Sequence, residues 1–110
     1  MDNGSLHKIA LILTAFRSLN PTMTVQVAHT LLLVALHDGK SLTEISDLSG
    51  FKYPTVSRNI LDLGQRNRKR EPGLGLVEAI TDPMELRKKQ VGLTPKGKAL
   101  LNQLDDIMKG

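Results

Sequence analysis

The chain has 110 residues, 40% of them hydrophobic, and it carries a formal net charge of +4. This length suits one domain, residues 1–110, and the absence of cysteine excludes disulfides, cysteine-based zinc sites and thiol redox chemistry. No apolar run approaches the roughly 20 residues that cross a bilayer, and the N-terminus lacks the pattern of a secretory signal. We therefore expect a cytoplasmic protein with no membrane partner.

The first two predicted elements are helices. Apolar residues recur at helical spacing from Leu6 to Phe16 and predict an amphipathic helix over 5–19, which ends before Pro21. Its broad apolar face suits contact with the chain's own core or with a partner subunit. Residues 24–37 are apolar almost all round, which is typical of a central helix, and Gly39 suits the turn after it.

Two further helices form a predicted helix-turn-helix. Ser41 and Glu44 have the spacing of a capping box, in which each side chain bonds a free backbone N–H of the first helical turn. The residues expected on the buried face of this short helix are Leu42, Ile45 and Leu48. Gly50 supplies the turn, and Pro54 suits the first turn of the helix that follows.

The second helix of this pair has an apolar and a polar side. The residues expected to face the core are Val56, Ile60 and Leu63, and those expected to face outward are Thr55, Ser57, Arg58, Asn59 and Asp62. After a polar, basic loop over 64–75, we predict two strands around 76–80 and 89–93, on either side of a turn at Asp82-Pro83. Thr94 and Pro95 then start a last helix over 95–108.

This order of elements predicts a mainly α (α+β) fold, a winged helix-turn-helix with about five helices and a two-stranded β-hairpin wing. Residues 66–98 hold nine basic and four acidic side chains, so positive charge gathers in the wing and its flanks, where a phosphate backbone would pass. A solvated basic surface is the alternative. We favour double-stranded DNA as the partner, because the helix-turn-helix directly precedes this charge.

The polar side of the second helix carries groups that suit the major groove. Arg58 can bond O6 and N7 of guanine, and Asn59 can pair with N6 and N7 of adenine. Thr55 and Ser57 can donate to phosphates or to base edges. The side chains expected on phosphates are Lys52 and Tyr53 at the helix entrance, and Arg66, Arg68, Lys69, Arg70, Lys88 and Lys89 in the loop and wing. An ordinary solvent-exposed helix face is the alternative.

Two segments resemble a known family. Glu85-x-Arg87-x-x-x-x-x-Leu93-Thr94-x-x-Gly97 is similar to the wing signature of the MarR-type (multiple-antibiotic-resistance regulator) winged-helix repressors, and the segments 42–48 and 54–58 resemble that family's helix-turn-helix. The resemblance spans about residues 24–108. It implies homodimers that bind pseudo-palindromic operators, usually as repressors that a small ligand releases. It also implies that Arg87 enters the minor groove and that Glu85 orients it, and a narrow A·T minor groove does attract arginine.

The chain departs from that family in four places. Glu85 stands where the family usually has Asp, and Leu86 where it commonly has a basic residue. The basic stretch 66–70 is an insertion, which we expect to contact phosphate. The chain has less helix at its ends than typical relatives, so a dimer built from the candidate dimerisation helices 5–19 and 95–108 would be compact. A small-molecule effector is therefore not favoured, although the family resemblance allows one.

The residues that usually carry chemistry are few. His7, His29 and His37 are too scattered for a metal trio, and neither a nucleophile elbow nor a glycine-rich phosphate loop occurs, so we expect no cofactor, no metal and no enzyme activity. The sequence predicts a homodimeric, sequence-specific transcriptional regulator, a repressor by resemblance. One alternative is a winged-helix interaction or assembly module that controls another regulator through its first helix. The other is a non-specific architectural DNA binder.

Overall fold

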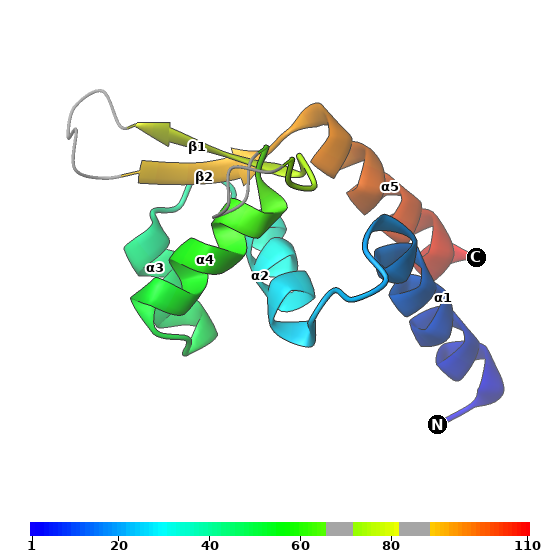
Figure 1. Cartoon of the computed structure of the whole chain (residues 1–110). Helices are drawn as coiled ribbons and strands as arrows, with labels where there is room; N and C mark the ends of the chain where they lie inside the picture. Colours follow the sequence, from blue (N-terminus) through cyan, green and yellow to red (C-terminus); the bar gives the residue numbers. More distant parts are fainter. Residues whose placement is uncertain (66–71, 82–88) are drawn as a thin grey trace.

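The computed structural model describes residues 1–65, 72–81 and 89–110, and Figure 1 shows their arrangement. Within these ranges the elements are α1 (Asn3–Leu19), α2 (Val25–Leu36), α3 (Leu42–Ser49), α4 (Tyr53–Leu63), β1 (Val77–Thr81), β2 (Lys89–Leu93) and α5 (Pro95–Lys109). The strands pair antiparallel, with Val77 opposite Leu93 and Ala79 opposite Val91. The predicted order of elements and the predicted fold class are confirmed.

The core forms around α2, which lies between the helix-turn-helix and the α1–α5 pair (Figure 1). All seven elements contribute buried apolar side chains, and Leu76 adds one just before β1: Ala15, Phe16, Leu31, Val34, Leu42, Ile45, Val56, Ile60, Leu63, Leu76, Val77, Val91, Leu100 and Leu104. Leu48, which is expected on the buried face of α3, is instead 51% exposed near the end of that helix. Val25 and Leu36 are also exposed, at the two ends of the apolar helix α2.

The capping box that opens α3 is present as predicted. Ser41 Oγ accepts a hydrogen bond from the Glu44 backbone N–H at 3.2 Å, and Glu44 Oε1 accepts one from the Ser41 backbone N–H at 3.3 Å. The hydrogen bond from the Ser41 backbone, with help from Lys40, lowers the pKa of Glu44 below its ordinary value. The start of α3 is therefore fixed by groups that lie within four residues of one another.

The turn between α3 and α4 is fixed by one glycine and two serines. Gly50 has a φ of 76°, a left-handed conformation that favours glycine. Ser46 Oγ donates to the Phe51 carbonyl oxygen at 2.6 Å, and Ser49 Oγ accepts from the Phe51 backbone N–H at 3.0 Å. These bonds satisfy both backbone polar groups of Phe51, so the angle between the two helices is set by hydrogen bonds as well as by packing.

The hairpin is tied to the helix-turn-helix at two points. The segment before α3 pairs with the middle of β2, because the Val91 backbone N–H donates to the Lys40 carbonyl oxygen at 2.9 Å. Just before β1, the Leu76 backbone N–H donates to the Leu63 carbonyl oxygen of α4 at 2.8 Å. Gly97 lets α5 approach this junction closely, since a Cβ at that position would collide with the Leu76 carbonyl oxygen.

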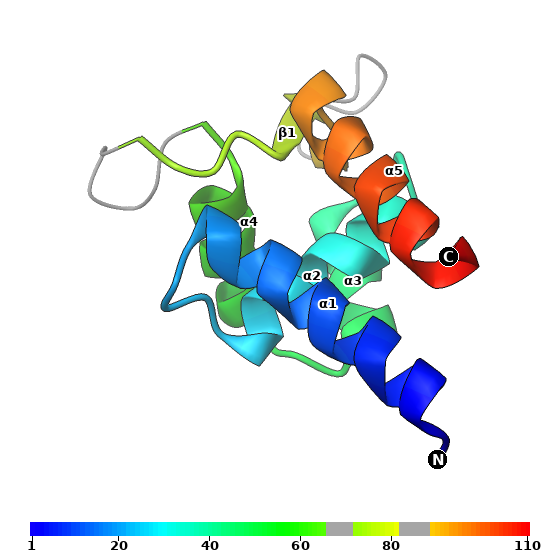
Figure 2. The same cartoon turned by 90° about the vertical axis from the view of Figure 1, so that its right-hand side faces the viewer.

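Helices α1 and α5 lie side by side at the end of the molecule that also holds both chain termini (Figure 2). Lys8 Nζ donates to the Met108 carbonyl oxygen at 3.0 Å across this pair. The hairpin points the opposite way (Figure 1), and the molecule is elongated, with extents of 48, 27 and 26 Å. Over the described ranges, none of the helices combines the length and apolarity needed to cross a bilayer.

We predict that Ser41→Ala lowers the free energy of unfolding by about 1 kcal/mol, because the first turn of α3 loses its side-chain cap. Urea denaturation followed by circular dichroism measures this change. Thr43→Ala is the matched control on the same helix, since Thr43 is exposed, and it should change stability by less than about 0.5 kcal/mol. Equal losses in the two variants would contradict the role given to the cap.

Candidate nucleic-acid interface

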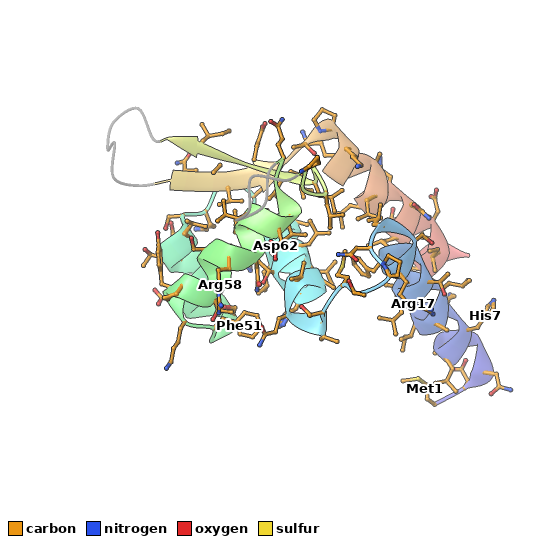
Figure 3. All side chains as sticks on the ribbon, in the orientation of Figure 1. Met1, His7, Arg17, Phe51, Arg58 and Asp62 are labelled. Atoms are coloured by element: carbon orange, nitrogen blue, oxygen red, sulfur yellow. The ribbon has the colours of Figure 1, made fainter. Side chains whose placement is uncertain are left out.

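Helix α4 has one face in the core and one face in solvent. Val56, Ile60 and Leu63 are buried, which follows their helical spacing. On the other side Arg58 is accessible near the middle of the helix, and Figure 3 shows it between Phe51, just before α4, and Asp62 near its end. Four further predicted site residues lie on the accessible part of α4 and its N-cap: Lys52 and Tyr53 are exposed, and Thr55 and Ser57 are half-buried.

Asn59 is the exception, and its predicted outward position is wrong. The side chain is only 7% exposed, and its Nδ2 donates a hydrogen bond to Thr30 Oγ1 on α2 at 3.1 Å. The position lies three residues after Val56 and four before Leu63, so it falls on the helix face that meets α2. Asn59 is therefore not available to pair with adenine.

The hairpin stands next to α4, as a shared DNA-binding surface requires. Ile60, Leu61 and Gly64 line an open groove of about 320 Å³ together with Val77 and Ala79 of β1. The Gly75 backbone N–H also donates to the Gly64 carbonyl oxygen at 2.8 Å. The end of α4 and the start of the hairpin are thus held together by packing and by hydrogen bonds.

The remaining predicted site residues lie in or beside two segments outside the described ranges. These predictions concern Arg66, Arg68, Lys69 and Arg70 in the basic loop and Glu85, Arg87 and Lys88 in the wing, and they stay predictions from the sequence. Lys89 is the first residue of β2. The described residues therefore cover the helix side of the predicted interface and the base of the wing.

The structure adds residues that the sequence did not single out. Thr30 is fully buried, and it is the partner of Asn59. A threonine on the buried side of an apolar helix was the available signal, but its partner lies 29 residues away in the chain. His29 on α2 packs edge-to-face on Phe51, with ring centroids 5.6 Å apart, and so supports the entrance to α4 from a second helix.

No family model and no curated protein sequence matches the chain, whereas solved structures do. A point mutant of S. aureus MepR bound to an oligodeoxyribonucleotide is 25% identical with a TM-score of 0.72, over 96% of this chain and 70% of that one. A MarR transcriptional regulator from Methanosarcina mazei Go1 is 22% identical with a TM-score of 0.70, over 89% and 63%. The transcriptional repressor CouR, bound to a 23-mer DNA duplex, is 23% identical with a TM-score of 0.66, over 96% and 67%.

Five helices and a two-stranded hairpin in the described ranges, with α3 and α4 joined by a tight turn, define a winged helix-turn-helix protein. The solved structures narrow this class further: the chain has the fold of the MarR-type transcriptional regulators. The resemblance noted in the wing and helix-turn-helix segments is thereby confirmed at the level of the fold. Among the described residues, no three His, Cys, Asp or Glu side chains gather as metal ligands.

Proposed function

We propose that this protein is a DNA-binding transcriptional regulator that recognises duplex DNA through α4. The observation that carries the proposal is the division of α4 into a buried apolar face and an accessible polar face centred on Arg58. Structures that share this fold include MepR and CouR in complex with DNA, which supports the same use of the fold here. Catalysis is not proposed, since the neighbours that are described by function are transcription regulators.

In this proposal α4 enters the major groove and the hairpin follows the flanking minor groove. Arg58 is long, accessible and able to fork onto guanine O6 and N7, which makes it the residue for base recognition. Lys52 and Tyr53 lie at the start of α4, where the N–H groups of the helix end also favour an anion. Two further contacts are proposed from the sequence alone. Arg87, oriented by Glu85, enters the minor groove, and the basic loop 66–70 contacts phosphates.

The homodimer is proposed from apolar residues that the single chain leaves uncovered. Helix α1 carries two apolar stripes, about a quarter-turn apart. One stripe, including Ala15 and Phe16, packs into the core, whereas Leu6, Ile9 and Leu13 are 51%, 45% and 52% exposed. Covering such half-exposed side chains stabilises a complex by on the order of 1 kcal/mol each. We propose that a second copy of the chain covers this stripe.

The position of this stripe agrees with a dimer that binds DNA. The first half of α1 has no buried residue, so its apolar side chains stay uncovered in the single chain. It lies with α5 at the end of the molecule away from α3 and α4 (Figure 1). A two-fold contact through α1 and α5 would leave α4 of both copies free to meet pseudo-palindromic half-sites. Repression, a cytoplasmic location and any small-molecule effector rest on the sequence.

Arg58→Ala should weaken binding to a preferred duplex by about 1–3 kcal/mol, because the variant loses a bidentate contact with guanine. The preferred duplex is the one that the wild-type protein selects from a random pool, and fluorescence anisotropy measures its affinity and that of a scrambled duplex. Arg17→Ala is the matched control, since this arginine is also exposed but lies on α1 (Figure 3). This variant should prefer the selected duplex over the scrambled one as strongly as the wild type does.

The same titrations separate the alternatives. An equal loss on both duplexes in Arg58→Ala would remove its role in base recognition. A wild-type protein that binds every duplex alike would favour the architectural binder, and one that binds no duplex at low salt would favour the protein-interaction module.

Replacing Leu6 and Leu13 together by Glu should convert the dimer to a monomer, because two charges then stand in the apolar contact. Sedimentation equilibrium should give a mass near 12.1 kDa for the variant and about twice that for the wild type. Leu48→Glu is the matched control, since Leu48 is 51% exposed on α3, and it should remain dimeric. A monomeric wild type, or a variant that stays dimeric, would contradict this interface.

A further inference from the structure

The contact between α2 and α4 contains one buried polar pair among apolar side chains. Asn59 of α4 and Thr30 of α2 are 7% and 0% exposed, and the other buried side chains of these two helices are apolar: Leu31, Val34, Val56, Ile60 and Leu63. A buried amide costs free energy unless it is hydrogen-bonded, and an apolar side chain would fill the same space without that cost. The presence of the pair therefore calls for a role other than burial.

The direction of this hydrogen bond is fixed by a second one. Thr30 Oγ1 donates to the Gln26 carbonyl oxygen of its own helix at 2.8 Å. A threonine hydroxyl has a single proton, so toward α4 this oxygen can only accept. Asn59 must then present its Nδ2 to Thr30, as it does at 3.1 Å. This hydrogen bond between Asn59 and Thr30 forms only in one orientation of α4 relative to α2.

This orientation bears directly on Arg58, the residue before Asn59. Apolar contacts are non-directional and tolerate small rotations of a helix, whereas a hydrogen bond weakens steeply when its distance or angle changes. With side chains a helix has a radius of about 5–6 Å, so a rotation of about 20° moves its outer face by roughly 2 Å. A shift of that size is enough to lose a bidentate contact with a base.

We propose that Asn59 and Thr30 are positioning residues whose buried hydrogen bond sets the rotation of α4 about its axis. The bond holds Arg58 in the register that base recognition needs, and it contributes to the choice of DNA sequence more than to net stability. This inference rests on the proposed function, because it concerns how α4 meets the bases. It assigns to Asn59 an indirect part in recognition instead of the direct contact expected from the sequence.

The test is the double variant Asn59→Leu/Thr30→Val, which removes both polar partners and leaves neither unpaired. Replacing both partners of a buried hydrogen bond by apolar groups of similar shape is nearly neutral for stability. The measurements are urea unfolding and the affinities for two duplexes, the one selected by the wild-type protein from a random pool and a scrambled duplex of equal composition. Ile60→Val is the control, because it trims a buried apolar side chain of the same helix without touching the polar pair.

We expect the double variant to unfold near the wild-type urea midpoint and to keep the wild-type affinity for the scrambled duplex. Its preference for the selected duplex should fall about tenfold, the discrimination that one base contact supplies. Ile60→Val should lower stability and keep the preference. A double variant with both wild-type stability and wild-type preference would overturn the inference while leaving the proposed function intact.

A second pair of variants keeps the test decisive if the double variant unfolds. Thr30→Ser retains the hydroxyl and should retain the preference, whereas Thr30→Val leaves the Asn59 amide unpaired and should reduce it. Equal preference in these two variants would overturn the inference. A wild-type protein that selects no duplex would overturn the proposed function, and the inference with it, so the two failures are distinguishable.

Discussion

The contact between α2 and α4 is the constraint on which the rest of this structure depends. Leu31 and Val34 of α2 and Val56 and Leu63 of α4 are all fully buried, so the apolar face of α4 has one place to pack. Once that face is buried, Arg58 has to be on the outside. The position of the hairpin also depends on this contact, because the Leu76 backbone N–H donates a hydrogen bond to the Leu63 carbonyl oxygen at the end of α4.

The polar and the apolar exposed surfaces lie at separate ends of the molecule. Helix α4 and its N-cap present polar and basic groups such as Lys52 and Arg58 next to the base of the hairpin, whereas α1 and α5 hold both termini and α1 leaves apolar side chains such as Leu6 and Leu13 half-exposed (Figures 1 and 2). A charged duplex and an apolar partner surface are different ligands, and separate ends would let the protein hold both at once, as the proposed dimer on DNA requires. Symmetry through the apolar end would set the spacing of the two recognition helices on DNA.

The fold could be predicted because its signals are local. Ser41 with Glu44, Gly50, and Thr94 with Pro95 act within about four residues, so the ends of α3 and the start of α5 follow from neighbouring residues. Whether a side chain faces the core or the solvent depends on residues that are far away in the sequence, so these positions were harder to predict. The partner that buries Asn59 is Thr30, and the apolar face of α1 is divided between core and solvent according to which elements reach it. Of the candidate site, Arg58 could be placed from helical spacing, whereas the buried support beneath it could not.

The accessible face of α4 and the adjoining hairpin are proposed to form, together, the surface that meets duplex DNA. NMR chemical-shift mapping tests this proposal most directly, by titrating a selected duplex into ¹⁵N-labelled protein. We expect the largest shifts on the backbone amides of residues 52, 53 and 55–58 and of the hairpin, and little change on α1. Shifts concentrated on α1 and α5, with α4 unchanged, would contradict the proposal.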